Sequence, residues 1–342
     1  MILHPGILAL ILGSSVTLLL ILLACRLAVC TLRYWDPLSS SQAQLQLERQ
    51  GELFSALVRC ALIFEIAALF LFLFTVDDLH PLFTGAMCAT GVLNLDPSGW
   101  WTLAGRCLVC FGAAFWLALD NLDRRSEDSP LVRPKSWLLL ALAPLMAGVF
   151  GLQLRFFLQL HPEVITSCCG AFFDRGSGLA AELAALPVRP AMLAFYLVLI
   201  SCTLLVGACL RWRSAWLRGL LSLGTFVLLP VALAAIVSFI SLYIYQLPTH
   251  HCPFDILQGH YHYVGYALYA GLAGAIFFGI LPGVSLLLRR TVPVEEVLVP
   301  AERRWLLLAG TSLLLFAALA SWPVVFSPFS LLDSDKFMGL AR

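Results

Sequence analysis

Long apolar runs, separated by short polar connections, occupy most of the chain. Runs of about 20 apolar residues are long enough to cross a bilayer as helices. Backbone groups in lipid must be satisfied within the spanning segment, and runs of this length exceed a barrel strand, so we expect helices. We place the spans at residues 6–29, 53–76, 101–120, 137–159, 189–210, 219–246, 263–288 and 305–326. The pattern predicts an all-α polytopic membrane bundle, with residues 1–342 as a single integral membrane domain.

The connections between the spans differ sharply in positive charge. One alternating set holds Arg26, Arg33, Arg49, Arg124, Arg125, Arg133, Lys135, Arg211, Arg213, Arg218, Arg289, Arg290, Arg303 and Arg304. The other set holds only Arg175, Arg189, Lys336 and Arg342. Because Lys and Arg concentrate in cytoplasmic connections, the first set is predicted to be cytoplasmic. An even number of spans then places both termini outside, so we expect a multi-pass protein of a bacterial inner membrane with periplasmic termini.

Composition narrows the classes of function. The chain is 61% hydrophobic and 12% charged, with a net charge of +1, so no basic surface for nucleic acid is indicated. It contains no G-x-x-x-x-G-K-[ST] motif, so nucleotide hydrolysis is not expected. The expected partners are the lipid membrane and further membrane subunits or a periplasmic protein.

One short loop carries the densest group of reactive side chains. Residues 248–262 contain His250, His251, Cys252, His260 and His262. Two other loops on the predicted outer face carry Cys88, Cys168 and Cys169. Each loop is held at both ends by a helix, and neighbouring helices pack about 8–10 Å apart. We therefore expect the three loops to converge on one Cys/His site.

Metal binding is the first chemistry that these residues suggest. Thiolates combined with imidazoles form a ligand set suited to Cu(I) or Zn(II). The candidate metal ligands are Cys88, Cys168, Cys169, His250, His251 and Cys252. The first functional hypothesis is that the protein handles a soft metal ion or reducing equivalents at the outer face, within a larger membrane complex.

Thiol–disulfide exchange is the second chemistry, with Cys252, Cys168, Cys169 and Cys88 as the catalytic residues. The compartment outside a bacterial inner membrane is oxidising, so unpaired thiols there need a reason. Arg106 and Arg155 lie near the outer ends of their spans, where buried arginines are functional candidates. With Tyr261 they are the candidate residues for binding an anionic or quinone-like cofactor.

The segment Cys252-Pro253-Phe254-Asp255-Ile256-Leu257-Gln258 resembles the C-P-x-C-[IL]-L-Q loop of DsbB-type membrane enzymes. Those four-span enzymes generate disulfides and reduce quinones, so the resemblance implies a thiol–disulfide oxidoreductase coupled to a membrane quinone. Asp255 stands in place of the second cysteine, which implies that Cys252 pairs with a cysteine from another loop. The three-loop pattern also resembles a family of uncharacterised multi-pass bacterial inner-membrane proteins.

Two further interpretations stay open. The outer cysteines can form structural disulfides in a non-catalytic membrane subunit, each worth about 2–4 kcal/mol. Paired histidines at the outer ends of spans can hold a b-type haem. A covalently attached haem is not indicated, because the chain has no C-x-x-C-H motif.

The predicted topology determines which positions a membrane-impermeant thiol reagent can reach. We expect the variants Ser126→Cys and Ser214→Cys to react only from the cytoplasmic side, and Cys252 to react only from outside. Labelling intact cells and inverted vesicles measures this difference. Reaction of Ser126→Cys from outside would overturn the map.

Overall fold

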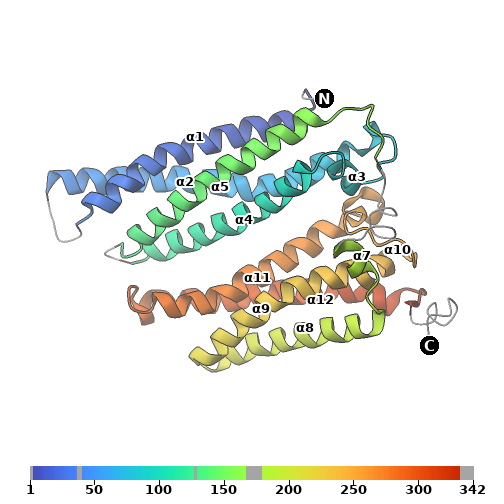
Figure 1. The fold of residues 1–342 in the computed structure, drawn as a ribbon. Coiled ribbons are helices and arrows are strands. Elements are labelled where there is room, and N and C mark those ends of the chain that lie inside the picture. The colour runs from blue at the N-terminus through green and yellow to red at the C-terminus, as the bar shows by residue number, and fades with distance from the viewer. Residues whose placement is uncertain (1–2, 37–40, 127–128, 167–178, 332–342) are drawn as a thin grey trace. The chain divides into compact units, whose positions relative to one another are not determined.

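The computed structural model describes residues 3–36, 41–126, 129–166 and 179–331, and most of these are helical (Figure 1). The long helices are α1 (Pro5–Tyr34), α2 (Gln42–Asp78), α4 (Ser98–Asp123), α5 (Val132–Gln159), α8 (Val188–Arg211), α9 (Ala215–Ala235), α11 (Val264–Leu288) and α12 (Val299–Phe326). α9 continues through a π-helical turn, η2 (Ile236–Ile240), into α10 (Ser241–Tyr245). Among the described residues, eight helices are long and apolar enough to cross a membrane, and they coincide with the predicted spans. The all-α polytopic bundle is therefore confirmed.

Short helical segments lie in the connections. They are η1 (His80–Leu82), α3 (Ala89–Leu93), α7 (Leu179–Ala184), η3 (Asp255–Leu257), η4 (Gly259–Tyr261) and the π-helical η5 (Val294–Leu298). Two long helices extend beyond the apolar runs that predicted them. α2 begins at Gln42, where Ser41 caps the helix by accepting a hydrogen bond from the Gln44 backbone N–H at 3.3 Å. α12 begins at Val299, directly after η5.

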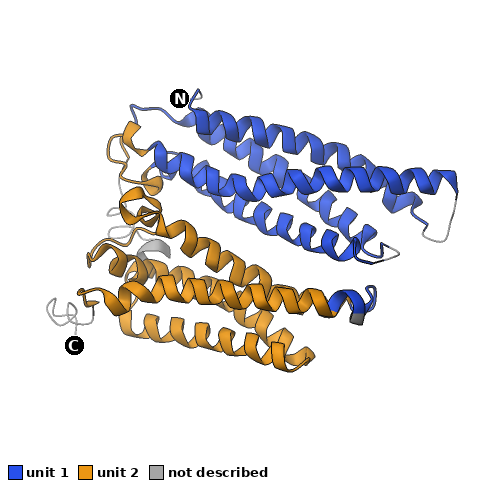
Figure 2. Cartoon of the chain, turned by 180° about the vertical axis from the view of Figure 1, so that it is seen from behind, with its two compact units in different colours: residues 1–79, 92–164, 289–298 blue, residues 80–91, 165–288, 299–342 orange. Residues whose placement is uncertain are grey.

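The chain is divided into two compact units (Figure 2). That residues 1–342 form a single integral membrane domain stays a prediction. Unit 1 comprises residues 1–79, 92–164 and 289–298. Unit 2 comprises residues 80–91, 165–288 and 299–342. Each unit contains four of the long helices. The loop that carries Cys88 belongs to unit 2, although it follows a helix of unit 1.

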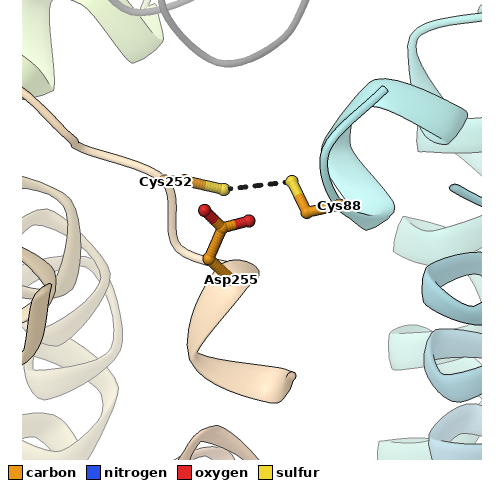
Figure 3. A group of neighbouring side chains, drawn as sticks. All are labelled: Cys88, Cys252 and Asp255. Carbon is orange, nitrogen blue, oxygen red and sulfur yellow. Dashed lines mark hydrogen bonds between the residues drawn. The ribbon is translucent and has the colours of Figure 1, made fainter. Parts of the chain in front are cut away.

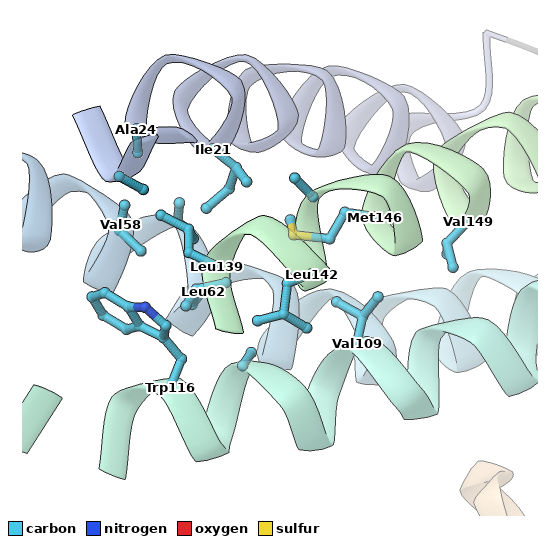
Figure 4. Packing of buried hydrophobic residues seen from close by; sticks show 14 residues of the cluster. Ile21, Ala24, Val58, Leu62, Val109, Trp116, Leu139, Leu142, Met146 and Val149 are labelled. Atoms are coloured by element: carbon cyan, nitrogen blue, oxygen red, sulfur yellow. The ribbon is translucent and has the colours of Figure 1, made fainter. Parts of the chain in front are cut away.

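Unit 1 is a ring of four helices. α1 packs on α2 and α5, and α4 packs on the same two helices. Buried aliphatic side chains, together with Trp116 and Met146, fill the centre of the ring (Figure 4). α4 and α5 approach closely at Gly105, because a Cβ there would collide with Val149. Small residues at such contacts are typical of helices that pack in lipid.

Unit 2 forms a corresponding ring from α8, α9, α11 and α12. α9 packs on α8 and α11, and α12 packs on the same two helices. The Phe195 ring centroid lies 5.7 Å from that of Phe239 and 5.8 Å from that of Phe316, both in edge-to-face geometry. α11 and α12 come close together, because a Cβ at Gly271 would lie 3.3 Å from the Phe316 backbone nitrogen.

The helices of the two units repeat one pattern of buried positions. In α4 the buried residues include Thr102, Arg106, Val109, Ala113 and Trp116, and in α11 the same spacing gives Leu268, Leu272, Ala275, Gly279 and Pro282. In α5 they include Leu139, Leu142, Met146, Val149 and Gln153, and in α12 the same spacing gives Leu306, Ala309, Leu313, Phe316 and Ala320. Any amphipathic helix has this period, so the shared spacing reflects the burial of one face of each helix.

The cysteine loops repeat as well. Cys88-Ala-Thr-Gly-Val-Leu-Asn and Cys252-Pro-Phe-Asp-Ile-Leu-Gln share a cysteine, a β-branched residue, a leucine and an amide at the same positions. Gly99 and Gly265 are the second residues of α4 and α11. A Cβ on Gly99 would lie 2.8 Å from Leu93 O, and one on Gly265 would lie 2.9 Å from Ile256 O. The two units thus share the order in which their long helices pack, and the segments that begin at Cys88 and Cys252 are similar in sequence.

Buried polar side chains form a network in the core of unit 1. Arg106 is 3% exposed, and its Nη2 donates to Ser14 Oγ at 3.2 Å and to Gln153 Oε1. Its Nη1 lies 3.7 Å from Glu65 Oε2. Thr17 Oγ1 donates to Glu65 Oε1 at 2.5 Å. These contacts give Arg106 a structural role in the core of unit 1. The sequence had suggested that Arg106 binds a cofactor.

Removing the positive charge at Arg106 is expected to destabilise unit 1. Arg106→Gln leaves the buried Glu65 carboxylate without its ion-pair partner, a change that typically costs about 3–5 kcal/mol. Arg155→Gln is the matched control, because Arg155 is exposed on α5. Thermal unfolding in detergent compares the two variants. Unchanged stability of Arg106→Gln, with altered thiol reactivity, would instead support the cofactor role.

Candidate functional site

Two loops of unit 2 bring a pair of sulfur atoms together. The connection between α2 and α4 carries Cys88, and the connection between α10 and α11 carries Cys252. Their Sγ atoms are 3.4 Å apart, and both side chains are completely buried (Figure 3). The hydroxyl of Thr90 lies 3.4 Å from Cys252 Sγ. The structure thus brings together two of the four cysteines that the sequence placed on the outer face.

A carboxylate faces this pair of sulfurs. Asp255 begins η3 and is 7% exposed, and its side chain points towards the sulfurs (Figure 3). Its Oδ2 pairs with His250 Nε2. Its Oδ1 is buried and has no hydrogen-bond partner within the described part of the chain. One ligand atom from each of Cys88, Cys252 and Asp255 lies within 4.8 Å of the other two.

Two tyrosines hold the Cys252 loop in shape. The Tyr245 hydroxyl donates to Cys252 O at 2.5 Å and accepts from the Ile256 backbone N–H at 3.0 Å. The Tyr269 hydroxyl donates to Pro253 O at 2.6 Å. One residue, Tyr245, therefore satisfies backbone groups on both sides of the turn that carries Cys252 and Asp255.

The ends of this loop adopt an unusual backbone conformation. Gln246 ends α10 with φ 56°, and His262 and Tyr263 precede α11 with φ 55° and 56°. Residues other than glycine rarely adopt the left-handed region, and they do so where the surrounding structure requires it. Here the left-handed residues mark the points where the chain leaves one helix and enters the next.

The Cys88 loop is fixed by contacts from two other segments. Gln258 Nε2 donates to Met87 O at 2.8 Å, which ties the two cysteine loops together. The Thr166 backbone N–H donates to Thr84 O at 3.1 Å. Gly85, with φ 90°, permits this approach, since a Cβ there would lie 2.1 Å from Thr166 O. The predicted site residues Cys168 and Cys169 lie outside the described residues.

A π-helical turn lies beside the sulfurs. In η2 the helix widens, and the carbonyl of Val237 accepts a hydrogen bond from His251 Nδ1 at 3.0 Å. Val237 also packs in the buried cluster that contains Cys88 and Cys252. Turns of this kind free a carbonyl from the helical ladder and are frequent at functional sites. His251, a predicted ligand, therefore contacts Val237, which in turn packs against the two cysteines.

The remaining predicted residues have other surroundings. His260 and His262 are exposed. The Tyr261 ring lies 4.8 Å from the Tyr245 ring. Partial burial raises the pKa of the Tyr261 phenol, and negative charge at Asp255 and Cys252 raises it further. Tyr261 is consequently a neutral hydroxyl at physiological pH.

Sequence reasoning missed Asp255, Thr90 and Tyr245 as members of the site. Asp255 was considered only as the replacement of a second cysteine. A signal for it was present, because a carboxylate three residues after a cysteine can return to the same point in a helical turn. No comparable local signal marks Thr90 or Tyr245, whose roles depend on contacts between segments.

Cys252 is buried beside the Asp255 carboxylate, which disfavours a thiolate, and two neighbouring donors act in the opposite sense. Its Sγ accepts from the Phe254 backbone N–H at 3.4 Å and faces the Thr90 hydroxyl. Donors aimed at a sulfur stabilise a thiolate, whether as a nucleophile or as a metal ligand.

No protein family model, curated protein or solved structure matches this chain. The function is therefore inferred from the site itself.

Burial at the site predicts slow modification of the native thiols. Cys252 is completely buried, whereas Thr249, three residues earlier, is exposed. A maleimide reagent should react readily with Thr249→Cys and only slowly with Cys252 until the protein is denatured. Mass spectrometry can compare the rate at Cys252 in the wild type with the rate at Thr249→Cys in a Cys252→Ser background. Because Ser126 is also buried, Ser214→Cys and Thr249→Cys are the better reporters of topology.

Proposed function

We propose that this integral membrane protein binds a borderline-soft metal cation, with Zn(II) as the best match, between Cys88, Cys252 and Asp255. The observation that carries the proposal is the buried Asp255 Oδ1, which has no hydrogen-bond partner in the described chain and stands beside two buried sulfurs. Buried polar atoms are normally satisfied, so such an atom marks the place of a missing partner. A cation would satisfy the oxygen and both sulfurs at once.

The distance between the sulfurs suits a metal. Zn–S bonds measure about 2.3 Å, so two sulfurs on one tetrahedral zinc lie about 3.8 Å apart. The Sγ atoms of Cys88 and Cys252 are 3.4 Å apart, and a small outward movement would create this geometry. A disulfide requires an approach to about 2.05 Å, which is the larger displacement.

The donor set favours Zn(II) over Cu(I). Zinc accepts thiolate, imidazole and carboxylate ligands, whereas Cu(I) selects soft sulfur donors. His250, on Asp255 Oδ2, would orient the carboxylate as an outer-shell partner. Three protein ligands leave the fourth tetrahedral position open. Cys168 and Cys169, which the sequence suggested as ligands, stay predicted candidates for this position. A protein with such a site at the predicted outer face would handle a metal ion there for a larger membrane complex.

Metal content and affinity test the proposal directly. The purified protein in detergent is expected to hold about one equivalent of zinc, and cobalt substitution should give the absorption of a tetrahedral thiolate site. Cys88→Ser and Cys252→Ser should abolish this binding. His250→Gln should weaken it about 10–100-fold, the typical effect of losing an outer-shell partner.

Cys202→Ser is the matched control, because Cys202 is a buried cysteine of α8 in the same unit. Its metal content should equal that of the wild type. Equal zinc binding by Cys88→Ser, Cys252→Ser and wild-type protein would refute the proposal.

A second candidate function is thiol–disulfide exchange, which the direct contact between the Cys88 and Cys252 sulfurs supports. Oxidation of the two thiols would form one S–S bond and release two protons and two electrons, which a membrane quinone would take up as it is reduced to quinol. The His250–Asp255 pair would accept a proton. Quinone reduction by the prereduced protein, in the absence of zinc, would favour this function over metal handling.

A further inference from the structure

Unit 1 contains a cavity of about 710 Å³ at the polar end of its helices, where α1 and α4 end and α2 and α5 begin. All of its lining residues belong to unit 1. Cavities of this size are typical of sites for small molecules. The end of the bundle at which it lies is the one predicted to be cytoplasmic, so the cavity is independent of the cysteine site.

The floor of the cavity has an excess of positive charge. Asp120 is fully buried, and its carboxylate contacts Arg59 Nε at 3.1 Å, Arg124 Nε at 3.3 Å and Lys135 Nζ at 3.0 Å. Lys135 Nζ also contacts Asp123 Oδ2 at 2.7 Å. Three cations thus face two carboxylates. The floor is therefore suited to a group with one negative charge.

The two arginines of the floor keep hydrogen-bonding capacity. Each approaches Asp120 through Nε, so the Nη groups are not used in these ion pairs. The contact from Arg59 is close but poorly aligned for a hydrogen bond. Guanidinium groups with available Nη–H donors match the oxygens of a phosphate.

A buried tryptophan adds an unused donor. Trp116, one of the buried side chains labelled in Figure 4, lines the cavity and is 2% exposed. Its indole Nε1 has no hydrogen-bond partner among the described residues. Buried indole N–H groups usually find a partner. This donor is a second indication that an acceptor group occupies the floor.

The rim of the cavity carries the opposite charge. Glu48 and Glu52 lie four residues apart on α2, hence on one face of the helix, and both line the cavity. Glu52 precedes Arg59 by about 10 Å along the helix axis. The carboxylates of Glu48 and Glu52 thus lie nearer the polar end of α2, and the guanidinium group of Arg59 lies nearer its membrane span.

We propose that this cavity binds the head group of a phospholipid that carries a phosphate and a primary ammonium group, that is, phosphatidylethanolamine. The phosphate contacts Arg59, Arg124 and the Trp116 N–H. The ammonium group, which is attached beyond the phosphate and so lies further from the hydrocarbon, contacts Glu48 and Glu52. A quaternary ammonium group has no N–H to donate to these carboxylates, and an anionic glycerol head group has no positive charge for them.

Lipid retention tests the proposal. The protein is incorporated into vesicles with equal amounts of phosphatidylethanolamine, phosphatidylcholine and phosphatidylglycerol, extracted in mild detergent, and its bound lipid measured by mass spectrometry. Phosphatidylethanolamine should be enriched about tenfold over the other two. Glu52→Gln, at an exposed position, should abolish the preference. Arg59→Gln and Trp116→Phe should lower total retention, and Trp116→Phe does so without changing any charge.

Arg125→Gln is the matched control, because Arg125 is exposed beside Arg124 but does not line the cavity. Equal retention of the three lipids, or a wild-type lipid profile in Glu52→Gln and Trp116→Phe, overturns the proposal. Displacement of the lipid by low concentrations of phosphoethanolamine would also overturn it, by identifying a water-soluble ligand. None of these variants changes a residue of the proposed zinc site, so the two proposals fail or stand separately.

Discussion

A polar group buried in a hydrocarbon environment is costly unless it has a partner, and this constraint shapes both units. In unit 1 the guanidinium of Arg106 is matched by Glu65 and by neutral oxygens. In unit 2 Arg218 Nη2 lies 2.7 Å from Glu302 Oε2, and both side chains are almost completely buried. Lys135 and Glu302 lie in the first turns of α5 and α12 and carry opposite charges. The two units therefore pair their buried charges through different residues.

The cysteine site departs from this rule in an informative way. Most buried polar groups of its loops are satisfied, including the backbone groups held by Tyr245 and Tyr269. Asp255 Oδ1 is an exception, and it faces the sulfurs. The hydrogen bonds of the two tyrosines fix the backbone positions of Cys252, Pro253 and Ile256 beside the sulfurs. The contrast between the satisfied backbone groups and this unsatisfied oxygen is the observation on which the proposal of a bound cation rests.

The helices could be predicted because the length and apolarity of a span are local properties of the sequence. The corresponding packing order of the two units could not be predicted in the same way, because it depends on contacts between helices. Glu65 and Arg106 illustrate the same limit, since hydrophobic runs locate spans without showing which helices are neighbours. The meeting of Cys88 with Cys252 was expected from the shortness of the loops. The position of the Asp255 carboxylate beside these sulfurs was not expected, because it depends on how the turn at η3 folds.

The two cysteine loops are similar in sequence but differ in charge. The segments beginning at Cys88 and Cys252 share a cysteine, a β-branched residue, a leucine and an amide at the same positions, and Asp255 in the second corresponds to Gly91 in the first. The carboxylate beside the two sulfurs therefore comes from one loop only. The cluster is chemically asymmetric, and the single substitution Asp255→Gly would remove its acidic side chain.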